Sequence, residues 1–243
     1  MISNTINNNW MRRMFDSIPQ RYVLLNKILT FGQDDRWRDK LLQNIQTKSG
    51  NKILDICTGT GDLALKLAKK FPNVEIYAMD FSPNMLHEAE KRAYKKGIKG
   101  IIFIEDDCTD MDFEDNFFDS ITISFGFRNL SYSKENLSKA LAEIYRVLKC
   151  GGNFAILETS QPKNIFIRKV FHIYVKRIVP ILGKLISGKG KPYAYLGGSI
   201  AKFFDREELE AILISKGFQR EKIIPFMFGG ILLCMFKKPA NGA

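Results

Sequence analysis

The sequence predicts an α/β fold with a seven-stranded, mostly parallel sheet and a C-terminal antiparallel hairpin. Three observations support this prediction. Short apolar runs alternate with amphipathic, helix-like segments from residue 52 to residue 158. A Gly-Gly pair at 229–230 separates two apolar runs, as in a β-hairpin. The 243 residues, 45% hydrophobic and 26% charged, suit one soluble domain with a large core.

The expected elements follow in chain order. An N-terminal helical segment (1–47) contains two short helices with a turn at 17–20, and a third helix at 35–46. The core (48–158) contains strands at 52–57, 74–79, 100–105, 118–124 and 153–158, and helices at 61–70, 84–96 and 134–148. The Gly151-Gly152 pair predicts a turn before the fifth strand. A helical cap (159–204) precedes a helix at 205–216 and strands at 223–226 and 230–236.

Composition limits the partners and the compartment. The chain has 37 Lys and Arg against 26 Asp and Glu, a net charge of +11. This excess favours nucleic acid, an acidic ligand or an anionic membrane as partner; a basic protein with no such partner is the alternative. Four scattered cysteines and two isolated histidines indicate no metal site and no disulfide framework, hence a reducing, cytoplasmic location. We expect neither a signal peptide nor a membrane-spanning helix.

The loop after the first strand predicts a nucleotide site. Residues 54–62 read L-D-I-C-T-G-T-G-D. Ligands of open parallel sheets bind beyond the carboxyl ends of the strands, and glycines let the backbone approach them closely. Asp80 ends the second strand, twenty residues after Thr60, where a carboxylate can accept from ribose hydroxyls. Ser82 is the better cap for the next helix. A nicotinamide dinucleotide fits these features as well.

Acidic strand ends distinguish the two cofactors. Asp55 lies inside the first strand, and residues 105–108 after the third strand read E-D-D-C. These carboxylates would repel a diphosphate but attract the sulfonium and ammonium groups of S-adenosyl-L-methionine. An acid in the third loop can also accept from the adenine amine. The pattern therefore favours S-adenosyl-L-methionine.

At these motifs the chain resembles the Rossmann-like class I methyltransferases. More narrowly, it resembles the ubiquinone/menaquinone biosynthesis C-methyltransferase family, through F-D-S-I-P-Q-R-Y (15–22), S-F-G-F-R-N (124–129), L-E-T-S-Q-P (157–162) and Y-A-Y-L-G-G-S-I (193–200). The resemblance implies C-methylation of a polyprenylated quinol, either demethylmenaquinol or 2-polyprenyl-6-methoxy-1,4-benzoquinol, in respiratory quinone biosynthesis. It implies cofactor contacts from Gly59, Thr60, Gly61, Asp80, Asp107, Cys108 and Ser124.

Candidate catalytic residues follow the fourth strand. In the implied reaction a ring carbon, more reactive in the phenolate form, attacks the methyl group. Arg128 stays protonated, so it can stabilise phenolate charge, and Asn129 can orient the other ring oxygen. Tyr195 is a candidate for contact with the ring, and Glu158 is a candidate base. Alternatively, Arg128 and Asn129 only hold the loop in place.

The expected cap is both basic and apolar. Residues 159–204 contain nine Lys or Arg and no Asp or Glu, with many aliphatic and aromatic residues between the bases. Bases at helical spacing beside an apolar face are typical of a helix on an anionic membrane. We therefore expect peripheral association with the inner face of the cytoplasmic membrane, where a polyprenyl tail would stay. An ordinary cap packed on the sheet is the alternative.

Two other functions are compatible with the same sheet. An RNA methyltransferase would bind phosphates through the basic cap. However, the cap is rich in aliphatic residues, and no N-P-P-Y-type tetrapeptide follows the fourth strand. A catalytically silent protein that binds S-adenosyl-L-methionine or assists assembly is the second alternative, which the intact glycine loop argues against. We expect no nucleic-acid partner, and the sequence leaves a homodimer open.

Overall fold

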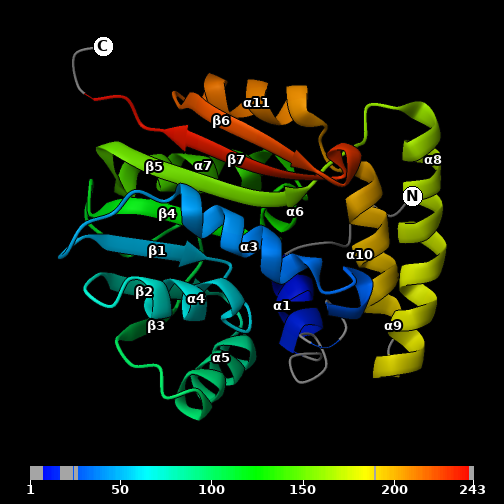
Figure 1. Ribbon diagram of the computed structural model, residues 1–243, viewed down its shortest axis with the longest axis horizontal. Helices are drawn as coiled ribbons and strands as arrows, with labels where there is room; N and C mark the ends of the chain where they lie inside the picture. The colour runs from blue at the N-terminus through cyan, green and yellow to red at the C-terminus, as the bar shows by residue number, and fades with distance from the viewer. Residues whose placement is uncertain (1–7, 17–23, 25–26, 189, 241–243) are drawn as a thin grey trace.

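The computed structural model describes residues 8–16, 24, 27–188 and 190–240 (Figure 1). Within these residues seven strands form one sheet in the order β3-β2-β1-β4-β5-β7-β6. The strands are β1 (Lys52–Ile56), β2 (Glu75–Asp80), β3 (Ile101–Glu105), β4 (Phe118–Ser124), β5 (Leu148–Thr159), β6 (Gln219–Phe226) and β7 (Ile231–Lys237). Neighbours among β1 to β5 are parallel, and β7 is antiparallel to both of its neighbours. The predicted fold class is therefore confirmed.

Helices cover both faces of the sheet. They are α1 (Asn8–Asp16), α3 (Gln33–Asn44), α4 (Asp62–Lys70), α5 (Pro83–Lys95), α6 (Phe127–Leu130), α7 (Lys134–Val147) and α11 (Arg206–Ser215). The apolar core on one face includes α7 and α11, and the core on the other includes α3 and α4. Ile53 and Leu54 point to opposite faces of β1, and both are fully buried. Burial on both faces is typical of parallel strands that are covered by helices on either side.

The cap stands across the carboxyl ends of the parallel strands (Figure 1). It consists of α8 (Ile165–Ile173), the π-helix η1 (Tyr174–Ile178), α9 (Val179–Ser187) and α10 (Lys191–Lys202). Gly197 allows α10 to pack tightly on η1, because a Cβ atom there would lie 1.9 Å from the carbonyl oxygen of Val175. None of the helices described has both the length and the apolar character needed to cross a membrane.

Several boundaries differ from the prediction. β5 begins at Leu148, so the Gly151-Gly152 pair lies inside the strand and not in a turn before it. Gly151 has a φ of 76°, and the pairing of β5 with β4 shifts register there, so the glycines form an irregularity within the strand. The final hairpin turns through the 3-10 helix η2 (Met227–Gly229). Helix α6 was not predicted, and the expected turn at 17–20 lies outside the described residues.

Candidate active site

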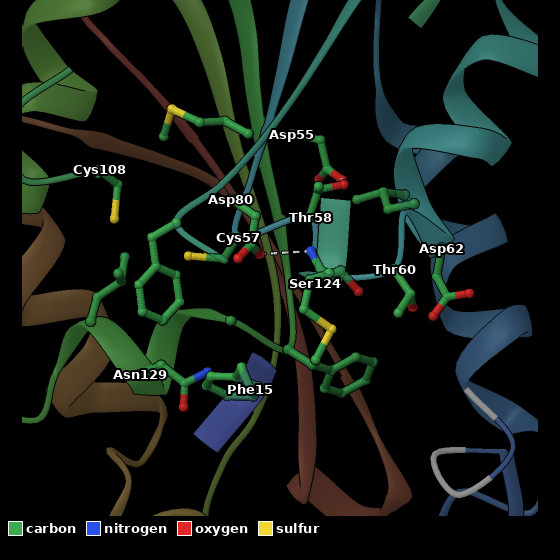
Figure 2. A pocket seen from close by; sticks show the side chains of 18 of the residues that line it. Phe15, Asp55, Cys57, Thr58, Thr60, Asp62, Asp80, Cys108, Ser124 and Asn129 are labelled. Carbon is green, nitrogen blue, oxygen red and sulfur yellow. Dashed lines mark hydrogen bonds between the residues drawn. The ribbon is translucent and has the colours of Figure 1, made fainter. Parts of the chain in front are cut away.

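A pocket of about 960 Å³, counting its part open to solvent, lies at the carboxyl ends of β1, β2 and β4 (Figure 2). We call it the cofactor pocket. The sequence-predicted residues that line it are Gly59, Thr60, Asp80, Asp107, Cys108, Ser124 and Asn129. Gly61, Arg128 and Tyr195 are not among its lining residues. Met11 and Phe15 of α1 and Arg38 of α3 complete the wall.

The glycine loop after β1 requires its glycines. Gly59 and Gly61 have φ values of 56° and 76°, which a side chain disfavours. A Cβ atom at Gly61 would lie 3.0 Å from the Cβ of Ala89 in α5, so Gly61 also allows two helices to approach. Thr60 between them is buried, and its hydroxyl oxygen has no hydrogen-bond partner among the described residues. This hydroxyl is therefore available to a ligand.

Asp55 holds the loop in shape. Its two carboxylate oxygens accept hydrogen bonds from the hydroxyls of Thr58 at 2.6 Å and Thr122 at 2.8 Å. Burial raises the pKa of Asp55 to about 6, against the lowering effect of these two hydrogen bonds. Asp55 lines the pocket, as the argument for a cationic ligand requires, but both of its oxygens already accept from the loop and the neighbouring strand.

Asp80 connects the first two loops. Its oxygens accept from the backbone amides of Gly59 at 2.8 Å and Ser82 at 2.9 Å, and Figure 2 shows the bond to the glycine loop. Ser82 caps α5 by accepting from the amide of Met85, which leaves the Asp80 carboxylate facing the pocket as the sequence suggested. Burial raises the pKa of Asp80 to about 6. A ligand that donates to this carboxylate, or carries positive charge, would favour its ionised form.

The loop after β3 contributes Asp106, Asp107 and Cys108. One oxygen of Asp107 accepts from both the amide and the hydroxyl of Thr109 at 2.9 Å, which orients the loop. Contact with Cys108, together with burial, raises the pKa of the Cys57 thiol well above its ordinary value. The Cys57 thiol is therefore neutral in this wall. Glu105, by contrast, pairs with Arg12 and does not line the pocket.

The loop after β4 divides its residues between two cavities. The amide oxygen of Asn129 is buried in the cofactor pocket and has no hydrogen-bond partner among the described residues. Arg128 lines a second cavity instead. Its guanidinium donates to Glu158 at 2.9 Å and to the carbonyl of Phe125 at 2.8 Å, and its backbone amide donates to Glu158 at 3.2 Å. Arg128 thus holds the loop and also faces a chamber.

This second cavity, which we call the apolar chamber, lies between the sheet and the cap. It encloses about 1450 Å³, again counting its open part. Its wall is mostly aliphatic and aromatic, and includes Leu29, Trp37, Ile167, Val170, Phe171, Val175, Val179, Leu196 and Ile200. Among the residues that the structure describes, Arg38 and Phe125 line both cavities. The cofactor pocket and the apolar chamber therefore share a wall.

Tyr195 lines neither cavity. It lies on α10 with its ring edge-on to Trp10 at 5.2 Å, and its hydroxyl is 3.5 Å from the sulfur of Met11. Burial raises its pKa, against the opposing charge of Arg128. The Tyr195 side chain therefore packs against α1, close enough to Arg128 to feel its charge but without lining either cavity.

The residues present fit S-adenosyl-L-methionine. The pocket offers buried acids for its cationic groups and its ribose hydroxyls, and apolar side chains such as Met79, Phe81 and Leu130 for a planar base. The buried, unpaired oxygens of Thr60 and Asn129 are those of a site whose ligand completes their hydrogen bonds. A diphosphate would face five lining aspartates, which strongly disfavour it: Asp55, Asp62, Asp80, Asp106 and Asp107.

Comparisons with known proteins agree with this chemistry. The model of the ubiE/COQ5 methyltransferase family matches residues 3–236. A demethylmenaquinone methyltransferase of Thermus thermophilus is 41% identical over 88% of this chain and 95% of that protein. A protein of Desulfotalea psychrophila named ubiquinone/menaquinone biosynthesis C-methyltransferase UbiE is 36% identical over 91% of this chain and 87% of that protein.

Solved structures share the fold. A SAM-dependent methyltransferase from Aquifex aeolicus superimposes with a TM-score of 0.61 at 19% identity, over 96% of this chain and 98% of that one. A Haemonchus contortus phosphoethanolamine N-methyltransferase in complex with S-adenosylhomocysteine gives a TM-score of 0.65 at 17% identity, over 93% of this chain and 60% of that one.

Proposed function

This chain belongs to the ubiE/COQ5 methyltransferase family and is an S-adenosyl-L-methionine-dependent methyltransferase, and we propose that it methylates a ring carbon of a polyprenylated quinol in quinone biosynthesis. One observation carries the choice of substrate: an acidic cofactor pocket adjoins a large apolar chamber through a shared wall. A quinol ring with a long hydrocarbon tail suits such a chamber, whereas a nucleotide would have to bury phosphates in it.

The chain's own residues orient the ring and its charge. The cofactor supplies an electrophilic methyl group on a sulfonium. Arg128 lines the chamber and keeps its charge, so it can stabilise the phenolate form of the ring. Asn129 lines the cofactor pocket and not the chamber, so we assign its free amide oxygen to accepting from the cofactor and not from the ring. Glu158 already accepts from Arg128 and Thr159, so we assign it to positioning Arg128 and not to removing a proton.

The reaction is tested with labelled cofactor. Purified protein is incubated with methyl-labelled S-adenosyl-L-methionine and a short-tailed demethylmenaquinol, its benzoquinol counterpart, or RNA. We expect label in a quinol ring. Label in RNA alone would replace the proposal with an RNA methyltransferase, and cofactor binding without transfer to any acceptor would indicate a catalytically silent protein.

Arg128 has its own prediction. Arg128→Lys keeps the positive charge, but a lysine ammonium lacks the fixed guanidinium plane that places Nη1 within hydrogen-bond distance of both Glu158 and the Phe125 carbonyl, so we expect kcat to fall roughly 10- to 100-fold. Cofactor affinity, measured by calorimetry, should change less than about 2-fold because Arg128 lies outside the cofactor pocket. Arg146→Lys, at an ion-paired arginine that lines neither cavity, is the matched control. Equal loss of turnover and affinity would assign Arg128 a structural role only.

The outer face of the cap supports membrane association. Its α8 to α9 segment exposes six large apolar side chains that do not line the apolar chamber: Ile165, Phe166, Ile173, Ile178, Ile181 and Leu185. Lysines and arginines alternate with them in the sequence, with no Asp or Glu. Phe31, Met227 and Phe228 line the apolar chamber and are themselves exposed, so they mark its open side. This combination supports a chain that docks on the inner face of the cytoplasmic membrane and receives the quinol there.

Vesicle binding tests this docking. Sedimentation with vesicles of 0 to 40% phosphatidylglycerol should give binding that rises with anionic lipid and falls with salt. Phe166→Ser and Phe228→Ser remove side chains that are 75% and 79% exposed, and each should weaken binding about 10-fold. Tyr94→Ser is the matched control, because Tyr94 is 89% exposed but lies on α5. Equal loss in all three variants, or binding indifferent to lipid charge, would contradict the assignment.

A further inference from the structure

Arg38 is the single cationic side chain among the described residues that line the cofactor pocket. Five aspartates account for the other charges of this wall. The acids explain how the pocket attracts the sulfonium, the ammonium and the ribose hydroxyls of S-adenosyl-L-methionine. They also repel the α-carboxylate of its methionine end, which needs a cation or several N–H donors.

The guanidinium of Arg38 is held in place but not saturated. Its Nη1 donates to Asp34 at 2.6 Å, and its Nε donates to the Ser124 hydroxyl at 3.2 Å. Its Nη2 lies 3.9 Å from Asp62, which is an ion-pair distance and longer than a hydrogen bond. The side chain is only 4% exposed. A buried guanidinium with donors left over in a ligand pocket is preorganised for an anion.

The partners of Arg38 locate this anion site within the pocket. Ser124 ends β4, and Asp62 is the first residue of α4, directly after the glycine loop. Arg38 therefore lies where β4 meets the N-terminus of α4, a helix end that also favours negative charge. Asp107 and Cys108, which follow β3, lie on the other side of β1 and β2 in the sheet order.

We propose that Arg38 binds the α-carboxylate of S-adenosyl-L-methionine and so fixes the cofactor with its methionine end against the apolar chamber. The guanidinium also stacks over the Phe125 ring, 5.5 Å from its centre, and these two side chains form the wall shared by both cavities. Binding the carboxylate thus anchors the methionine end at the boundary between the two cavities, where the methyl group must be transferred to the substrate. Arg38 is a positioning residue, and the inference depends on the cofactor but not on the identity of the quinol.

The test compares two ligands that differ only in the carboxylate. Calorimetry measures the affinity of S-adenosylhomocysteine and of its decarboxylated analogue. The wild-type protein should prefer the carboxylate ligand about 10- to 100-fold, as expected for a charge-assisted contact. Because removing Arg38 alone would leave Asp34 buried and unpaired, the informative variant is the double substitution Asp34→Asn/Arg38→Gln. Its preference should fall below about 3-fold, whereas the control Asp34→Asn keeps the wild-type preference.

A second measurement uses the unmodified protein. The Nε–H resonance of Arg38 should shift on adding S-adenosylhomocysteine and shift much less with the decarboxylated analogue. Equal shifts with both ligands, or equal preference in the wild type and the double variant, would overturn the proposal. Should the double variant not fold, the resonance decides. Failure of the wild type to bind either ligand would overturn the cofactor assignment itself, and this proposal with it.

Discussion

The affinity for S-adenosylhomocysteine should increase as the pH rises from 5 to 7, and Asp80 should cause the increase. Asp80 is 6% exposed, and burial raises its pKa to about 6 in the free protein. Its carboxylate faces the cofactor pocket, where ribose hydroxyls can donate to it. Because donors favour the charged form, the ligand binds the ionised carboxyl and lowers its pKa.

The size of the effect follows from this pKa. A carboxyl with a pKa of about 6 is ionised in roughly one molecule in eleven at pH 5, and in about ten of eleven at pH 7. If the ligand binds only the ionised form, affinity at pH 5 is about 10-fold lower than at pH 7. The stability of the free protein depends on pH in the opposite direction. Because burial raises the pKa of Asp80 in the folded state, this carboxyl contributes stability that is present below about pH 4 and is lost as the pH rises through about 6.

Calorimetry at half-unit steps of pH, in two buffers with different ionisation enthalpies, measures both the affinity and the protons released. Asp80→Asn mimics the neutral carboxyl. Because it is never ionised, it should bind more weakly than the wild type at both pH 5 and pH 7, by at least about 10-fold at pH 7, and should lose most of the pH dependence. A wild-type affinity that is constant from pH 5 to 7 would refute the reasoning. A full slope that persists in Asp80→Asn would assign it to another group.

Three further predictions concern stability. Gly197→Ala should lower the free energy of unfolding by about 1–3 kcal/mol, and with it the melting temperature, because the added Cβ would lie 1.9 Å from the Val175 carbonyl oxygen. Gly198→Ala, with nothing within 4 Å, should be neutral or stabilising, and equal effects would contradict the packing argument. Phe118→Ala should cost about 3–5 kcal/mol in urea unfolding because the ring is fully buried; a cost below 1 would contradict it. Asp205→Ala should cost about 1 kcal/mol through loss of a capping box, and an unchanged midpoint would contradict this.

Sequence patterns predicted those parts of the molecule that depend on local rules. Strand and helix alternation, the glycine loop and the Ser82 cap each rest on one short stretch of chain, and the structure has all of them. That Arg128 and Asn129 line different cavities could not be predicted in this way. Adjacent residues in the short helix α6 face different cavities, and only the packed arrangement decides which one each residue meets.

The position of Arg38 in the pocket could not be predicted from local sequence either. It lies on a helix that the sequence does predict, four residues after Asp34 and next to Trp37. An arginine beside apolar residues, with an acid one turn before it, is a signal for a buried ion pair. The pattern does not say that this pair faces a ligand, because Ser124, which also contacts Arg38, is 86 residues away in the chain.

The position of β7 has a consequence for biosynthesis. This strand is the seventh in chain order, yet it lies between β5 and β6. A chain emerging from the ribosome therefore completes β5 long before the neighbour of its open edge exists. An unpaired edge recruits other chains, so we expect the nascent protein to need protection by chaperones until residues 231–237 are in place. The hairpin ends this exposure, although it lies apart from the pocket where the cofactor binds.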